Sequence, residues 1–154
     1  MGIVLLSATI AAAGGCRVRT ICVRTQISPA ANQNHPVAVD ILLVRNKDLI
    51  KKLLATPASD WFENRAQFGR DYPDAKDLIV IHREWVPGQV VPCSTIPLSP
   101  MPRATIVFAN YFSKGDHRAH LKNGQSAAIH LTDEDLEIVP IQDCSRTTCP
   151  KDTP

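Results

Sequence analysis

Alternation of apolar and polar residues is the main pattern along this chain, and it predicts short β-strands. Strand residues point alternately to the two faces of a sheet, so a strand that covers a core shows a period of two. Segment 17–27 shows this pattern, and the further segments that we expect to form strands are 37–44, 78–86, 104–112, 117–121, 126–131 and 136–141. Such a series of short strands predicts a mainly β fold, a two-sheet β-sandwich.

One part of the chain follows a helical period instead. Asn46 is a suitable cap for a helix that Pro57 ends. The apolar residues that share one side of this helix are Leu49, Ile50, Leu53 and Leu54. Asp60, with an acidic residue three positions later, predicts the start of a second short helix, and we expect its Trp61 and Phe62 to pack into the core. A short helical insertion therefore follows the second strand.

Turn residues mark the connections between these elements. Segment 28–36 holds two prolines and two asparagines, which predicts a loop. Segment 90–103 holds four prolines and is expected to run as an edge strand or a long loop, because proline cannot donate to a sheet ladder. Asn123-Gly124 lies between the predicted strands at 117–121 and 126–131, which predicts a β-hairpin.

The N-terminus carries a short run of apolar and small residues, Ile3 to Gly15, that ends at Cys16. Its length is about half of the ~20 residues that span a membrane, so it is typical of a signal peptide. Small residues before a cysteine suit a lipoprotein signal peptidase, so we predict a signal peptide at 1–15 and a covalent lipid on Cys16. The run lacks a preceding Lys or Arg, which a start upstream of Met1 would explain. The alternative is an apolar first strand with an incidental cysteine.

Four further cysteines are typical of disulfides in an exported chain, and they allow three pairings. Cys144 and Cys149 enclose only four residues and can pair locally, which would leave Cys22 to pair with Cys93. A zinc site is the competing interpretation, although these spacings are not of the Cys-x-x-Cys type. The expected organisation is one sandwich domain at 16–143 and a C-terminal tail at 144–154.

Charge and motifs exclude several classes of function. The net charge is +2, with both signs scattered along the chain, so nothing points to nucleic acid or to a polybasic membrane surface. There is no Gly-rich phosphate loop and no recognisable nucleophile motif. His117 and His120 have an odd spacing that places them on opposite faces of a strand, so we predict no metal site there.

The order of several short motifs resembles a known family. The motifs are Pro36-Val37-Ala38-Val39 after a Pro/Asn loop, Asp60-Trp61-Phe62 in the helical segment, Val86-Pro87-Gly88-Gln89 after a strand, and the late strand Ile106 to Phe112. In this order they are similar to the outer-membrane lipoprotein of type VI secretion systems (TssJ, also called SciN or VasD). Asp40 stands where an arginine is common in that family.

The resemblance implies a transthyretin-like sandwich that its lipid holds at the periplasmic face of the outer membrane. Arg17 after the lipidated cysteine, in place of the aspartate that retains lipoproteins in the inner membrane, fits this location. The family has no enzymatic activity, and we expect no cofactor other than the lipid, no nucleic acid and no small-molecule substrate.

The implied partner is the periplasmic domain of the large inner-membrane subunit, a protein like TssM or IcmF. The loop expected to bind it consists of Ala30, Ala31, Asn32, Gln33, Asn34 and His35. Asn32, Asn34 and His35 are the expected hydrogen-bonding residues. This adaptor interpretation predicts a solid sandwich without a deep polar pocket.

Two alternative functions remain open at this point. One is a pilot-type lipoprotein that escorts the pore subunit of another secretion system and binds a short peptide or helix in a groove. The other is a lipidated periplasmic ligand-binding domain, which requires a concave pocket with convergent polar groups.

Overall fold

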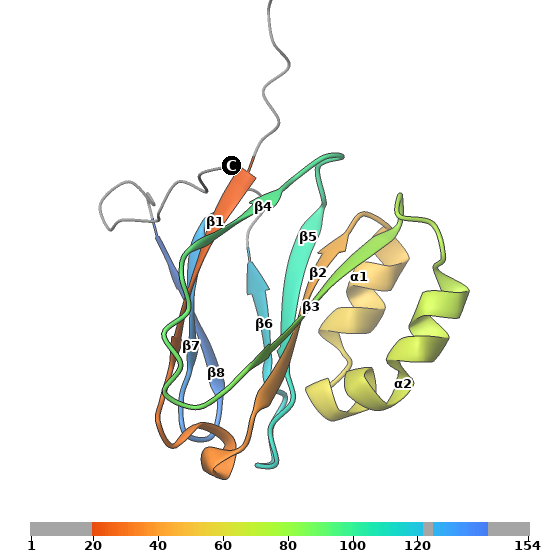
Figure 1. Cartoon of the computed structure of the whole chain (residues 1–154). Coiled ribbons are helices and arrows are strands. Elements are labelled where there is room, and N and C mark those ends of the chain that lie inside the picture. The colour runs from red at the N-terminus through yellow and green to blue at the C-terminus, as the bar shows by residue number, and fades with distance from the viewer. Residues whose placement is uncertain (1–19, 122–124, 142–154) are drawn as a thin grey trace, which may run out of the picture.

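Two four-stranded β-sheets face each other in a computed structural model, which describes residues 20–121 and 125–141 (Figure 1). Four predictions fall outside these residues: the signal peptide, the lipid on Cys16, the Asn123-Gly124 turn and the tail with Cys144 and Cys149. The described part of the chain contains no helix that is long and apolar enough to cross a membrane.

The elements follow the predicted order closely. They are β1 (Thr20–Ile27), the 3₁₀ turn η1 (Ala31–Asn34), β2 (Val37–Val44), α1 (Lys47–Leu54), α2 (Ala58–Asp71), β3 (Leu78–Trp85), β4 (Ser94–Pro97), β5 (Ala104–Ala109), β6 (Arg118–Leu121), β7 (Ala127–Leu131) and β8 (Leu136–Pro140). One sheet has the strand order β4-β1-β7-β8 and the other β3-β2-β5-β6. The pairing of β1 with β7 is parallel, and the other pairings are antiparallel.

Two hydrophobic cores explain the nearly continuous apolar sequences of β2 and β5. The first core lies between the sheets and contains Val37, Val39, Ile41 and Leu43 of β2. The second lies between the outer face of the sheet β3-β2-β5-β6 and the two helices, and it contains Leu42, Val44, Leu49, Leu53 and Trp61. A strand that is buried on both faces has apolar residues at nearly every position instead of at every second one. Asp40 is the exception in β2, since it is the only charged residue of this strand and is buried.

The helical insertion is confirmed, with one correction. The Asn46 side chain caps α1, because its Oδ1 accepts from the backbone N–H groups of Asp48 at 3.0 Å and Leu49 at 3.1 Å. The predicted start of α2 at Asp60 is wrong, since the helix begins at Ala58. Pro57 occupies its cap position, and the Ala58 N–H donates to Asp116 O at 2.9 Å, so a contact with another loop starts the helix.

The hairpin expected around Asn123-Gly124 is wrong. Strand β6 pairs with β5, whereas β7 pairs with β1 and β8, so these two strands lie in different sheets. An Asn-Gly pair favours a tight turn locally, but burial decides which sheet a strand joins. The side chains of Ala127, Ile129 and Leu131 are buried in the core between the sheets. The proline-rich segment was expected to form either an edge strand or a long loop, and it contains the edge strand β4.

The predicted pairing of Cys22 with Cys93 is also wrong. Cys93 is a free cysteine, whereas Cys22 is disulfide-bonded. The register of β1 and β4 explains why the two do not meet, because it places Cys22 opposite Thr95. Cys93 lies two positions before Thr95, which places it about 7 Å away along the chain.

Among the described residues, no group of three or more His, Cys, Asp or Glu side chains is placed to hold a metal ion.

Candidate partner-binding site

Three loops meet at one end of the sandwich, at the bottom of Figure 1. They are the β1–β2 loop (28–36), the β5–β6 loop (110–117) and the β7–β8 loop (132–135). This loop end, as we call it, lies opposite the end where β1 begins and β8 ends. It contains the segment that the sequence predicts as the partner-binding loop.

Asn32 ties the three loops together. The residue is buried, with only 2% of its surface exposed. Its Oδ1 accepts from the Phe112 N–H at 2.7 Å, its Nδ2 donates to Pro36 O at 3.1 Å, and its backbone N–H donates to Asp133 O at 3.0 Å. The internal bonds use the groups that were expected to contact a partner. That expectation is therefore corrected for Asn32, which has a structural role.

The tip of the β1–β2 loop has an unusual backbone. Asn32, Gln33 and Asn34 have positive φ angles of 49°, 56° and 63°. Such left-handed residues are uncommon, and asparagine tolerates them better than most. The hydrogen bonds of Asn32 hold this conformation, so the tip is preorganised.

Ser28 fastens the base of the same loop. Its N–H donates to Leu131 O at 2.8 Å, and its hydroxyl donates to Asp133 Oδ1 and accepts from the Ala30 N–H. The Ser28 carbonyl also accepts from the N–H of Gly88 at 3.2 Å. Gly88 has a φ of 71°, where an L side chain would be strained. The β3–β4 connection is thereby joined to the loop end.

Ser113, His117 and Asp135 meet at the loop end in an order that superficially resembles a catalytic triad. His117 Nδ1 lies 2.7 Å from Asp135 Oδ1, and Ser113 Oγ lies 3.4 Å from His117 Nε2. The Ser113 hydroxyl, however, donates to Glu134 O at 2.6 Å, and His117 Nε2 lies 2.9 Å from the Ser113 carbonyl. Because the hydroxyl proton is directed away from the imidazole, the cluster clamps two loops and does not activate a nucleophile.

Tyr111 adds a further bond between the same two loops. Its hydroxyl donates to Thr132 O at 2.9 Å. Burial raises the pKa of Tyr111 well above its ordinary value, and the charges of Asp135 and Asp133 raise it further. The phenol therefore stays neutral and keeps its donor proton.

The exposed surface of the loop end differs in part from the predicted loop. Gln33, Asn34 and His35 are exposed together with Ala30, whereas Ala31 is buried. Phe112 is 64% exposed, and its ring meets the His35 ring edge-on with centroids 5.1 Å apart. Sequence reasoning missed Phe112 as a surface residue, because it ends a segment that reads as a buried strand.

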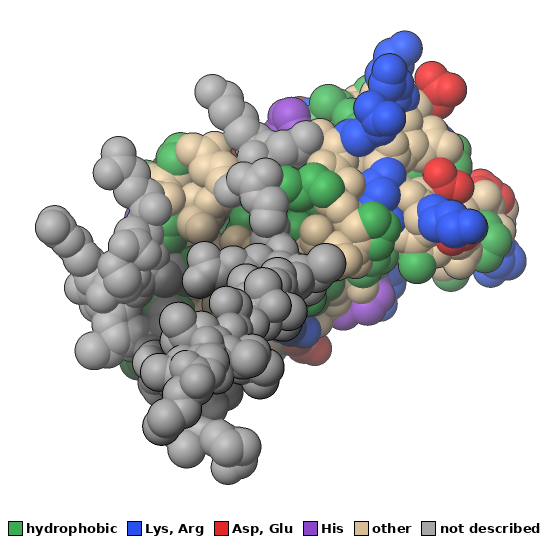
Figure 2. Space-filling view, turned by 90° about the horizontal axis from the view of Figure 1, so that it is seen from above, with side chains coloured by type: hydrophobic (Ala, Val, Ile, Leu, Met, Phe, Trp, Pro, Cys, Tyr) green, Lys and Arg blue, Asp and Glu red, His purple; other side chains and the backbone are tan. Residues whose placement is uncertain are grey.

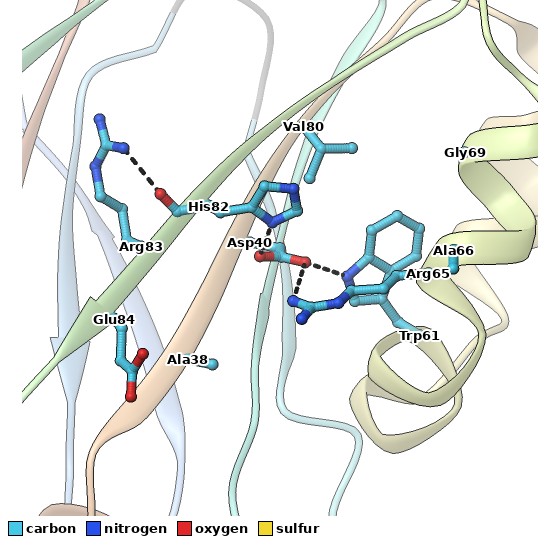
Figure 3. A pocket seen from close by; sticks show the side chains of 10 residues that line it. All are labelled: Ala38, Asp40, Trp61, Arg65, Ala66, Gly69, Val80, His82, Arg83 and Glu84. Carbon is cyan, nitrogen blue, oxygen red and sulfur yellow. Dashed lines mark hydrogen bonds and ion pairs between the residues drawn. The ribbon is translucent and has the colours of Figure 1, made fainter.

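A pocket of about 680 Å³ lies elsewhere, between α2 and the outer face of β2 and β3 (Figure 3). Asp40 lies in it with Trp61, Arg65 and His82 around its carboxylate. This open pocket lies outside the space between the two sheets, which buried apolar side chains fill. The helical layer creates this pocket, because α2 covers only part of the outer face of the sheet.

The face of the molecule seen in Figure 2 carries side chains of both charge signs. Figure 2 shows basic and acidic side chains intermixed on the side that carries the helices. This distribution agrees with the small net charge of +2. Specific contacts, not a general electrostatic attraction, would have to select a partner.

The fold is similar to solved structures of type VI secretion lipoproteins. TssJ1 from Pseudomonas aeruginosa is 14% identical with a TM-score of 0.65, and the match covers 82% of this chain and 99% of that chain. Lip from Serratia marcescens, a membrane-bound component of the type VI secretion system, is 16% identical with a TM-score of 0.61, over 82% of this chain and 100% of that chain.

A chain of a type VI membrane complex is 17% identical with a TM-score of 0.57, over 80% of this chain and 100% of that chain. No family sequence model and no curated protein sequence matches the chain. The two-sheet β-sandwich with a helical insertion, predicted from the pattern of strands, is thus confirmed as the fold, and so is the transthyretin-like form that the resemblance implies.

Proposed function

We propose that this protein is the lipid-anchored outer-membrane component of a type VI secretion membrane complex and binds the periplasmic domain of the large inner-membrane subunit. The observation that carries the proposal is the likeness in fold, which extends over the whole or nearly the whole of two type VI lipoproteins. The motif order in the sequence supports it independently. The protein acts by binding and not by catalysis.

The direction of the chain supports a bridging role. Cys16, the proposed lipid site, precedes β1 by a few residues. Strand β1 has eight residues and spans about 26 Å. It runs from the end of the sandwich nearest the lipid to the loop end (Figure 1). The lipid would hold one end at the membrane, and the loop end would point into the periplasm.

The loop end has the properties of a preformed binding surface. Asn32, Ser28 and His117 fix its loops from within, so little conformational entropy is lost on binding. Its accessible side chains include Gln33, Asn34, His35 and Phe112. An exposed aromatic ring on a rigid frame is typical of a residue that contributes strongly to a protein interface.

Capture from native envelope extract tests the partner. The bait is the domain from Arg17 to Pro154, compared with a variant carrying Gln33→Gly, Asn34→Gly and His35→Ala. Glycine keeps the left-handed backbone, and Asn32 is left in place, so the melting temperature should stay within about 2 °C. We expect the wild type to capture the large inner-membrane subunit and the variant to lose it.

A matched control for this experiment changes exposed residues of the helices, Lys51→Gln and Glu63→Gln. This variant should capture the subunit as the wild type does. Capture of a pore-forming outer-membrane subunit in place of the inner-membrane protein would favour the pilot-type alternative and contradict the proposal.

Replacing the proposed lipid site, Cys16→Ser, should release the protein from the membrane fraction without unfolding it. An acyl chain contributes about 0.8 kcal/mol per buried CH₂, so its loss removes most of the membrane affinity. Fractionation followed by a high-salt wash measures this. Retention of the variant in the washed membranes would show that the attachment does not depend on a lipid.

A further inference from the structure

The buried carboxylate of Asp40 orients the side chains of Arg65 and His82 in the pocket between α2 and β3. Asp40 is 1% exposed. Its Oδ2 accepts from Trp61 Nε1 at 2.8 Å, and its Oδ1 lies 2.7 Å from His82 Nδ1. Arg65 approaches the same carboxylate from α2, with Nη1 3.9 Å from Oδ2. A buried acceptor of this kind fixes the orientation of the groups around it.

The two oriented groups keep unused hydrogen-bonding capacity that faces the pocket (Figure 3). The Arg65 side chain is 50% exposed, and among the described residues its guanidinium makes the ion pair with Asp40, a contact with the Phe62 ring and no hydrogen bond. The His82 side chain is 60% exposed. Since Nδ1 donates to the Asp40 carboxylate, Nε2 is left as an acceptor for an N–H or hydroxyl group of a ligand. A guanidinium with free donors matches a carboxylate in geometry and charge.

Small residues provide the space beside these donors. Ala38 on β2 and Ala66 and Gly69 on α2 line the pocket. A Cβ built on Gly69 would meet no atom within 4 Å, so the pocket is open at this point. The volume of about 680 Å³ lies within the usual range for ligand pockets.

The pocket lies beside an edge strand that an extended peptide could join. Strand β3 lies at one edge of its sheet, because among the described residues it pairs only with β2. With eight residues it is the longest of the four edge strands described. A peptide that adds to such an edge directs alternate side chains to the face that carries the pocket. Glu84 lies two residues beyond His82 on that face, which disfavours a second acidic side chain there.

From these features we infer that the pocket binds one carboxylate of an extended peptide segment of a partner protein, through the guanidinium of Arg65 held by Asp40. The peptide lies along β3 and places a glutamate or aspartate side chain between β3 and α2. This site lies outside the loop end, so it does not depend on the function proposed above.

The indole N–H of Trp61 offers a direct readout. The chain contains two tryptophans, Trp61 and Trp85, and Trp61 Nε1 donates to Asp40 in the pocket floor. In a ¹⁵N–¹H spectrum of the domain from Arg17 to Pro154, we expect acetyl-Thr-Val-Glu-Val-Thr-amide to shift the Trp61 indole signal and leave that of Trp85 in place. The glutamine counterpart of the peptide should cause no shift.

Two variants and one control locate the site. Arg65→Ala should weaken binding of the glutamate peptide by about tenfold or more, and Gly69→Leu should abolish it by filling the pocket. Arg70→Ala, on the same helix but not in the pocket, should bind as the wild type does. Equal binding of the glutamine peptide, or unchanged binding by Arg65→Ala, would overturn the inference. If glutarate saturated the pocket at the same concentration as the peptide, the inference that the carboxylate comes from a peptide would be contradicted.

Discussion

Replacing Trp61 with alanine is expected to lower the free energy of unfolding by about 4 kcal/mol. Trp61 is 1% exposed, and its ring stacks on Phe108 with centroids 5.4 Å apart and an interplanar angle of 10°. The change would leave a large cavity between α2 and the sheet. It would also remove the hydrogen bond of 2.8 Å to the buried carboxylate of Asp40. Urea denaturation of the domain from Arg17 to Pro154 measures the loss.

A second substitution separates packing from hydrogen bonding at this position. Trp61→Phe keeps most of the ring contact but removes the N–H donor, so we expect a loss of about 2 kcal/mol. Adding Asp40→Asn to Trp61→Phe should cost less than Asp40→Asn alone, because the indole N–H that stabilises the Asp40 carboxylate is then already absent. A loss below about 1 kcal/mol for Trp61→Ala would mean that α2 does not depend on this contact.

The second large effect is expected at Asn32, where alanine should cost about 3 kcal/mol. The Phe112 N–H and the Pro36 carbonyl would lose their partner, and alanine would be strained at a φ of 49°. Asn32→Gly removes the backbone strain but not the lost bonds, so it should cost about 2 kcal/mol. Chemical denaturation of both variants gives the two contributions.

Asn34 provides the matched control for Asn32. It has the same residue type and a φ of 63°, but it is exposed. Asn34→Gly should change the stability by less than about 0.5 kcal/mol or raise it slightly. If Asn34→Gly were as destabilising as Asn32→Gly, the left-handed turn itself, and not the hydrogen bonds of Asn32, would hold the loop end together.

Most of the fold could be predicted because its signals are local. The apolar run of β2 and the helical period after Asn46 require only neighbouring residues, and the strand and the helix that they predict agree with the structure. The assignment of β6 and β7 to different sheets could not be predicted, because the Asn-Gly signal describes a turn and not the core that each strand covers. The pairing of cysteines likewise depends on a register that the sequence does not show.

The candidate sites were only partly predictable for a related reason. The β1–β2 loop could be singled out from its composition and the family resemblance, but the burial of Asn32 depends on bonds to Phe112, 80 positions away. Asp40 is a charged residue in an apolar strand, which signals a buried polar group. Its partners Trp61 and His82 lie 21 and 42 positions away, so the pocket they form could not be derived from sequence spacing.

Photo-crosslinking in native envelopes tests the proposed role of the loop end most directly. A benzophenone amino acid replaces Gln33 in the full-length protein, and the same group replaces Glu63 on α2 as a matched control, since both side chains are exposed. We expect the probe at position 33 to crosslink to the large inner-membrane subunit and the probe at position 63 to give no such product. A crosslink to that subunit from position 63 alone, or from neither position, would contradict the assignment of the loop end as the partner-binding surface.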